Sequence, residues 1–200
     1  MIGGAPTVGK SFTARRLSEE LEIPWISTDT IREMMRKIVD RGKYTNLFRF
    51  EDEERLAEQY LTTHTPQQIV DNQNKEGSDV WKGVMALIET DYSWKNFIIE
   101  GVAILPSLVA QIKIDDCEVK PIFLVDNDKE RTRKVVFERG LWDDANKYPD
   151  SVKEIEVEWA TLFNDFIRKE SSKYGYKPYE ITDREQLISS LMGELKGWLN

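Results

Sequence analysis

The sequence contains one cysteine, one histidine and no long apolar run, and each of these absences excludes a class of protein. With only Cys117 among 200 residues, the chain cannot form an internal disulfide, which is typical of proteins in the reducing cytosol. A single histidine, His64, cannot build a histidine-rich zinc site. No apolar segment approaches the roughly 20 residues that cross a bilayer, and no secretory signal opens the chain. We therefore expect a cytoplasmic protein without a membrane partner.

The chain also lacks a surplus of positive charge. Its 28 lysines and arginines stand against 36 aspartates and glutamates, for a net charge of −8. A protein that binds nucleic acid needs a basic face, so no nucleic-acid partner is expected. The net negative charge of the protein repels a small anionic substrate, so specific lysines or arginines must form the site that binds it. Monomer and homodimer both remain open.

Short apolar segments alternate with longer segments of helical spacing along the whole chain. The predicted strands are residues 1–2, 24–27, 97–100, 119–125 and 176–181. Five predicted helices span residues 10–22, 51–62, 66–92, 106–112 and 128–138. Another is capped by Thr28 or Asp29 and runs to 40. A long helix begins at 151, and the last one follows Asp183. This alternation predicts one α/β domain over residues 1–200, with a parallel sheet covered on both faces. The first strand is so short that either it is truncated here or the natural chain begins earlier.

A complete phosphate-binding motif follows the first strand. The glycines of G-x-x-x-x-G-K-[ST] let backbone N–H groups wrap around a phosphate, the lysine reaches the β and γ phosphates, and the hydroxyl ligates Mg²⁺. A random chain of this length contains the pattern on the order of 1% of the time, so a chance match is disfavoured. The motif predicts ATP and Mg²⁺ as ligands, held by Gly4, Ala5, Pro6, Thr7, Val8, Gly9, Lys10, Ser11 and Phe12.

One acidic residue follows the second predicted strand and another ends the third, at the edge of the sheet where ligands bind. Asp29 is a candidate to orient or deprotonate an acceptor hydroxyl, and Arg32, one helical turn on, to grip an acceptor anion. Glu100 is a candidate for Mg²⁺ or the acceptor, and Gly101 lets the backbone approach closely. Which acid serves the metal and which the acceptor stays open. The structural alternatives are an N-cap for Asp29, a surface cation for Arg32 and a solvated carboxylate for Glu100.

Arginines cluster around the helix after the fourth strand. Residues 128–150 are predicted as a lid, in which Arg131 or Arg139 neutralises the charge that develops during phosphoryl transfer. These two residues share a helix face, and Arg133 does not. The alternative is a solvated basic helix face.

Residues 43–93 are predicted as a helical insertion that binds the acceptor. Within it, Arg49 and Arg55 are further candidates for anion contacts. The favoured alternative is that they are surface arginines paired with acids among core aromatic side chains.

Three segments, from Ile2 to Ser11, from Ile26 to Glu33 and from Ile98 to Pro106, resemble those of P-loop small-molecule kinases, in order and in spacing. Among these, the segments look most like 2-phosphoglycerate kinase-like proteins. The resemblance implies the three-layer P-loop NTPase fold of the nucleoside-monophosphate-kinase type, with strand order 2-3-1-4-5. It places Lys10 and Ser11 on phosphate and Mg²⁺, Asp29 and Arg32 at the acceptor and Glu100 beside the metal. Ala103 stands where such proteins often have histidine, and residues 140–144 match no lid of this kind.

Together these observations predict an ATP-dependent kinase that phosphorylates a small, anionic, hydroxyl-bearing metabolite such as a 2-phosphoglycerate-like acid. Two main alternatives stay open. One is a nucleoside or nucleotide kinase, and the other is a nucleotide-dependent switch or binding module that transfers no phosphate. A kinase that acts on nucleic acid or protein is a weaker third alternative.

Overall fold

The computed structural model describes residues 1–53, 57–90, 95–115, 117–141 and 146–199, with side-chain positions lacking for 50–53. Five strands lie within these residues: β1 (Ile2–Gly4), β2 (Trp25–Ser27), β3 (Ile98–Glu100), β4 (Ile122–Val125) and β5 (Tyr179–Glu180). The helices are α1 (Lys10–Leu21), α2 (Thr28–Ile38), α3 (Thr45–Glu53), α4 (Ala57–Thr63), α5 (Pro66–Ile88), α6 (Pro106–Val109), α7 (Lys129–Arg139), α8 (Asp150–Lys173) and α9 (Arg184–Leu199). None of the helices in the described part of the chain is long and apolar enough to span a membrane.

The strands form one parallel sheet in the order β2-β3-β1-β4-β5. This confirms the predicted α/β fold, its parallel sheet and its strand order. β1 is the central strand, with Ile2 paired to Glu100 of β3 on one side and to Ile122 of β4 on the other. All five carboxyl ends lie at one edge of the sheet, because the strands are parallel.

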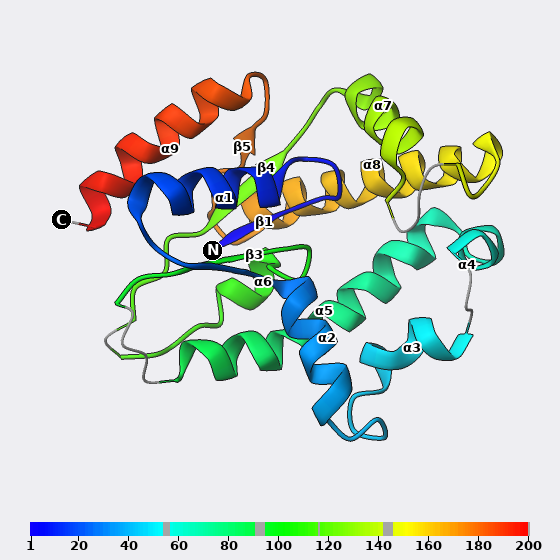
Figure 1. Cartoon of the computed structure of the whole chain (residues 1–200), viewed down its shortest axis with the longest axis horizontal. Coiled ribbons are helices and arrows are strands. Elements are labelled where there is room, and N and C mark those ends of the chain that lie inside the picture. The colour runs from blue at the N-terminus through cyan, green and yellow to red at the C-terminus, as the bar shows by residue number, and fades with distance from the viewer. Residues whose placement is uncertain (54–56, 91–94, 116, 142–145, 200) are drawn as a thin grey trace.

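Helices cover both faces of this sheet and bury its apolar strands. Figure 1 shows α1 and α9 together on one side, with the long α8 on the other. Phe123 and Leu124 of β4 and Trp159 and Phe163 of α8 are among the fully buried core side chains. Near-continuous burial of β3 and β4 is what a parallel sheet between two helical layers requires.

Helices α2 to α5 form a unit beside the edge strand β2 (Figure 1). α2 and α5 cross closely, because Gly83 has no side chain: a Cβ there would lie 2.5 Å from Sδ of Met35 and 2.7 Å from Cγ2 of Ile31. This unit falls within the segment predicted as an acceptor-binding insertion, and that role stays a prediction.

Several local predictions were wrong, including the strand start at 119 and the helix end at 112, which lie at Ile122 and Val109. The N-cap of α2 is Ser27, whose Oγ accepts from the Thr30 amide at 3.0 Å, so neither Thr28 nor Asp29 caps the helix. The helix predicted over 51–62 is replaced by two, α3 and α4, separated by residues outside the described part. β5 spans two residues instead of six, and these pair with Leu124 and Val125 of β4.

Candidate active site

The predicted phosphate-binding loop runs from the end of β1 to the first turn of α1. Thr7 and Gly9 both have positive φ, at 71° and 83°, which turns the chain back on itself around a small space. Val8 is buried beneath the loop, and the amide of Thr13 donates to the Gly9 carbonyl at 2.9 Å. The loop therefore has the backbone turn that a phosphate cradle needs, at the N-terminus of a twelve-residue helix.

Lys10 is a buried cation inside this loop. It is 9% exposed, and its Nζ donates to the carbonyl of Ala5 at 2.7 Å. Burial lowers its pKa to about 8, an effect that Glu100 and Asp29 oppose and Arg139 reinforces. Four charged groups from four different segments thus act on one another at this point. A buried ammonium whose hydrogen-bond partner is a neutral backbone carbonyl suits an anionic ligand, because the ligand would supply the negative charge that compensates its burial.

Ser11 and Glu100 bring two oxygen ligands together. The Ser11 hydroxyl donates to Oε1 of Glu100 at 3.0 Å, and Glu100 is 3% exposed at the end of β3. Burial raises the pKa of Glu100, while Lys10 and the Ser11 hydrogen bond oppose the rise. Within the described residues, no group of three or more His, Cys, Asp and Glu side chains could hold a metal. A hydroxyl and a carboxylate nevertheless suit Mg²⁺, which takes few protein ligands beside phosphate and water.

Gly101 lets the end of β3 pack against the start of α2. Its φ is 149°, and a Cβ there would lie 1.8 Å from Oγ1 of Thr28. Thr28 is itself 2% exposed and directly precedes Asp29. The absence of a side chain at Gly101 therefore lets the first turn of α2, which carries Asp29, pack close enough for Asp29 to act on Glu100.

Asp29 and Arg32 form an ion pair on the first turn of α2. Nη1 of Arg32 lies 3.0 Å from Oδ1 of Asp29 and 3.9 Å from Oε2 of Glu76. Burial lowers the pKa of Arg32, but Asp29 and Glu76 more than offset this, so the net shift is upward. Arg32 stays charged, and its carboxylate partner Asp29 is 64% exposed to solvent.

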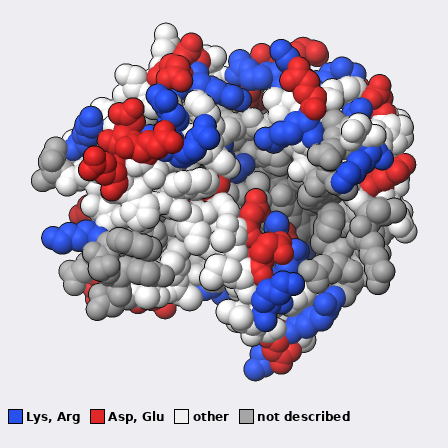
Figure 2. Space-filling model, viewed as in Figure 1, with Lys and Arg blue, Asp and Glu red and all other residues white. Residues whose placement is uncertain are grey.

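A polar cavity of about 230 Å³ opens beside this pair, between α2, α3, α4 and α5. Figure 2 shows acidic and basic side chains adjacent to one another on the face that carries α2. Arg36 closes one wall through bonds to Glu33 at 2.9 Å, Glu76 at 2.8 Å and the Leu47 carbonyl at 2.9 Å. The lining combines arginines with amides: Arg32, Arg36, Asn46, Arg49, Tyr60, Ile69, Asn72, Gln73 and Glu76.

The predicted lid arginines have different surroundings. Arg139 ends α7, and its charge acts on Lys10. Arg131 instead donates to Asp126 at 3.1 Å and to the Ile181 carbonyl at 2.7 Å, which ties the ends of β4 and β5 together. Arg133 pairs with Glu154 and lies 4.0 Å over the ring of Phe137. Of the three, Arg139 is the one near the phosphate loop.

Sequence reasoning missed Arg36 and Glu76, and its candidate Arg55 lies outside the described residues. Arg49 lines the cavity and donates to Oδ1 of Asn72 at 2.8 Å. Burial raises the pKa of Glu76, while Arg32 and Arg36 oppose the rise. Glu76 is one of 36 acidic residues, and no motif surrounds it. Only the crossing of α2 and α5 reveals that it pairs with Arg36.

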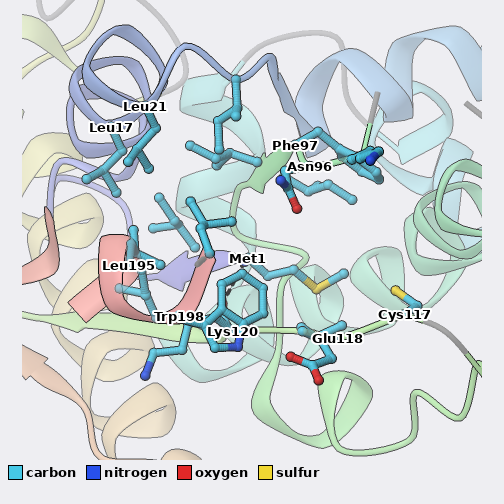
Figure 3. A pocket seen from close by; sticks show the side chains of 18 of the residues that line it. Met1, Leu17, Leu21, Asn96, Phe97, Cys117, Glu118, Lys120, Leu195 and Trp198 are labelled. Atoms are coloured by element: carbon cyan, nitrogen blue, oxygen red, sulfur yellow. Dashed lines mark hydrogen bonds between the residues drawn. The ribbon is translucent and has the colours of Figure 1, made fainter. Parts of the chain in front are cut away.

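A second and larger cavity, of about 820 Å³, lies at the opposite edge of the sheet. Figure 3 shows side chains from the ends of α1 and α9 on one side of it, with Met1, Asn96 and Phe97 nearby. It is lined by residues at or before the amino ends of β1, β3 and β4, whereas the phosphate loop follows the carboxyl end of β1. Its size does not make it the candidate site, because Lys10, Asp29 and Glu100 are absent from its lining.

Comparison with known proteins gives relatives of one kind. No family model matches the chain. Proteins named 2-phosphoglycerate kinase from Pyrococcus furiosus and Pyrococcus horikoshii are 29% and 27% identical over 98% of this chain. One from Methanocaldococcus jannaschii is 28% identical over 70%. This chain spans 63% of the length of both Pyrococcus proteins and 45% of the Methanocaldococcus protein.

The fold also has a counterpart among solved structures. The crystal structure of a Thermus thermophilus protein matches all of this chain and 96% of its own, with a TM-score of 0.53 and 16% identity. At that identity the likeness concerns the fold alone. The resemblance to P-loop small-molecule kinases, and among them to 2-phosphoglycerate kinases, that the three sequence segments predicted is confirmed by these relatives.

Proposed function

We propose that this chain is an ATP-dependent phosphotransferase, which moves the γ-phosphate of MgATP to a hydroxyl of a small anionic metabolite of the 2-phosphoglycerate kind. The observation that carries the proposal is that Glu100, Asp29 and Arg139 all lie close enough to Lys10 to influence its pKa. The site thus combines a candidate phosphate-binding cation, Lys10, with a candidate metal ligand, Glu100. Asp29 adds a candidate base, and Arg139 a second cation. The names of the relatives support the same reaction class.

In this proposal the phosphate loop and Lys10 hold the polyphosphate, and Ser11 and Glu100 supply the protein ligands for Mg²⁺. The 3.0 Å hydrogen bond between Ser11 and Glu100 supports this, since it already holds the two oxygens side by side. Held by Ser11 and Glu100, Mg²⁺ would neutralise part of the charge on the phosphates. Arg139, at the end of α7, adds positive charge that acts on the same point as Lys10.

Asp29 orients the acceptor hydroxyl and takes its proton. Arg32 holds an anionic group of the acceptor, because its guanidinium keeps its charge and borders the polar cavity. The carboxylate and the guanidinium are one helical turn apart on α2, so they present themselves to the same small molecule.

The size of the cavity favours a few-carbon acceptor over a nucleoside. Pockets that hold drug-sized ligands measure roughly 300–1,000 Å³, and this cavity is about 230 Å³. Its arginines and amides match a molecule with oxygen-rich, anionic groups.

The test is a phosphorylation assay over a metabolite panel, read by mass spectrometry. The panel contains 2-phosphoglycerate, 3-phosphoglycerate, glycerate, nucleosides and nucleoside monophosphates, and Lys10→Met serves as the inactive control. We expect ATP-dependent product from a glycerate-like acid. Product from nucleosides or nucleotides alone would assign the chain to that rival class. ATP binding without transfer to any acceptor would leave a nucleotide-dependent switch.

A further inference from the structure

The guanidinium of Arg32 is only partly occupied by its neighbours. Its Nε donates to Oε1 of Glu33 at 3.1 Å, and its Nη1 lies 3.0 Å from Oδ1 of Asp29. Among the residues that the structure describes, none forms a hydrogen bond with Nη2 of Arg32, although the side chain lines the polar cavity. An anionic group of the acceptor can therefore bind at Nη2. This step, and the inference built on it, rest on the proposed function.

Glu76 already extends a carboxylate toward the same guanidinium. Its Oε1 accepts from Nη2 of Arg36 at 2.8 Å, whereas its Oε2 lies 3.9 Å from Nη1 of Arg32. The first contact is a hydrogen bond, and the second is too long for one. Glu76 is thus anchored to Arg36 and has its other oxygen near Arg32 without bonding to it.

An acceptor anion that binds Arg32 comes close to this second oxygen of Glu76. Glu76 lines the same cavity, and its side chain is only 20% exposed, so water screens its charge poorly. Burial also raises the pKa of Glu76, which indicates that its negative charge is already disfavoured there. A second negative charge at Arg32 must therefore displace the carboxylate of Glu76 or be repelled by it.

Glu33 offers a comparison within the same cluster, because it contacts the same two arginines from outside the cavity. Its Oε1 lies 3.1 Å from Nε of Arg32 and 2.9 Å from Nη1 of Arg36. Its side chain is 53% exposed, and it is absent from the lining of the cavity. The two carboxylates thus share their cations and differ in whether they border the space that an acceptor would fill.

We propose that Glu76 is a specificity-determining residue, which limits how much negative charge the acceptor site binds. In the empty site its carboxylate lies beside Arg32, and in the occupied site it repels the anion that binds there. This repulsion grows with the charge of the ligand. A new phosphate monoester adds about two negative charges, so Glu76 acts more strongly against the product than against the acceptor and favours product release.

The test is calorimetric titration with 2-phosphoglycerate and with glycerate, in the presence of Mg²⁺ and an ATP analogue that cannot transfer its γ-phosphate. The proteins are wild type, Glu76→Gln and the matched control Glu33→Gln. Glutamine at position 76 can still accept from Arg36, and circular dichroism checks that the variant is folded. We expect Glu76→Gln to bind 2-phosphoglycerate about tenfold more tightly than wild type, and glycerate, which lacks the phosphate, only about twofold more tightly. Glu33→Gln should stay within about twofold of wild type for both acids, because water screens its charge.

A second measurement uses the wild type alone, so it does not depend on the folding of a variant. With MgADP bound, 2,3-bisphosphoglycerate should bind at least about tenfold more weakly than 2-phosphoglycerate, although it offers the arginines one more phosphate. Equal or tighter binding of the bisphosphate would overturn the proposal.

The variants can overturn it in two further ways. Unchanged or weaker binding of 2-phosphoglycerate in Glu76→Gln would mean that Glu76 only positions Arg36. An equal gain in Glu33→Gln, or for glycerate, would mean that the effect depends neither on the cavity nor on the charge of the ligand. If the wild type binds neither acid, the acceptor class of the proposed function fails. If the wild type binds 2-phosphoglycerate and Glu76→Gln binds it no more tightly, the acceptor class stands and only the role of Glu76 fails.

Discussion

The hydroxyl of Ser11 donates to Oε1 of Glu100 over 3.0 Å and joins the first turn of α1 to the end of β3 across 89 positions. Both are oxygen ligands of the kind that Mg²⁺ prefers. Their contact links the phosphate loop to the acidic residue of the neighbouring strand, and it suggests how metal dependence can be tested residue by residue.

Glu100→Gln should weaken ATP binding at least tenfold when Mg²⁺ is present and leave it unchanged in excess chelator. The amide can still accept from Ser11, so the fold is kept while the carboxylate charge is lost. Calorimetric titration with and without Mg²⁺ makes the measurement. An equal loss of affinity in chelator would show that Glu100 acts on something other than the metal.

Lys10→Met should abolish ATP binding, with a loss of at least about 100-fold, yet raise the free energy of unfolding by about 1 kcal/mol at pH 7. The reason is that burial disfavours the ammonium in the ligand-free protein, as its lowered pKa indicates. Urea unfolding followed by circular dichroism gives the stability. Lys37→Met, at an exposed position of α2, is the matched control and should change neither quantity. Loss of stability in Lys10→Met would contradict the interpretation.

ATP binding should take up a proton at pH 9. The pKa of Lys10 is about 8 in the free protein, so the amine is mostly neutral at that pH, and bound phosphates restore the ammonium. ATP affinity therefore falls as pH rises above 8. Folding shows the opposite trend: the unfolded chain, with the ordinary pKa of 10.5, binds more protons between pH 8 and 10.5, so this group adds stability as pH rises there. Calorimetry in buffers of different ionisation enthalpy measures the uptake, which Lys10→Met should lack.

Asp29→Asn should lower turnover by about 10² or more while ATP affinity stays within about twofold. The amide keeps a contact to Arg32 but cannot take a proton from the acceptor. Steady-state kinetics with the acceptor found in the metabolite panel, together with ATP titration, separates the two effects. Asp40→Asn, beyond the end of the same helix, should behave as wild type. Unchanged turnover in Asp29→Asn would leave this residue a structural role only.

Gly101→Ala should destabilise the fold by about 2 kcal/mol or more, because its Cβ would lie 1.8 Å from Oγ1 of Thr28 at a positive φ. Gly193→Ala is the matched control: Gly193 lies inside α9 with nothing within 4 Å of an added Cβ. Alanine there should stabilise by about 0.5–1 kcal/mol, since glycine weakens a helix interior. Thermal or urea unfolding distinguishes the two, and equal effects would refute the close contact of Gly101 with Thr28.

Much of the fold was predictable, because its signals are local. Apolar strand segments and helical spacing gave the parallel sheet, and the phosphate-binding motif fixed the loop between β1 and α1. Ser27 was overlooked as the cap of α2, since three consecutive residues there can all cap a helix and only the backbone decides among them. The short β5 was also hidden, because its length depends on its pairing with β4, which is a contact between distant parts of the sequence.

The candidate site was predictable only where a motif or a strand end marked it. Lys10, Ser11, Asp29 and Glu100 carry such marks. Glu76 does not, because it gains its position where α2 and α5, which lie apart in the sequence, pack together. Arg131 and Arg139 looked equivalent in the sequence, because they share one helix face. In the structure Arg131 donates to the carbonyl of Ile181, whereas the charge of Arg139 acts on the buried Lys10.

The hydrogen atom that serves as the side chain of Gly83 sets how near α2 can come to α5, and α2 carries both Asp29 and Arg32. A bulkier residue at that crossing would displace the two as a pair, so their mutual spacing would be preserved while their reach toward Lys10 changed. If the chain acts as proposed, selection of the acceptor and its alignment for transfer are therefore separable. Substitutions in the cavity wall would then alter which molecule is held, and substitutions at the helix crossing would alter where it is presented.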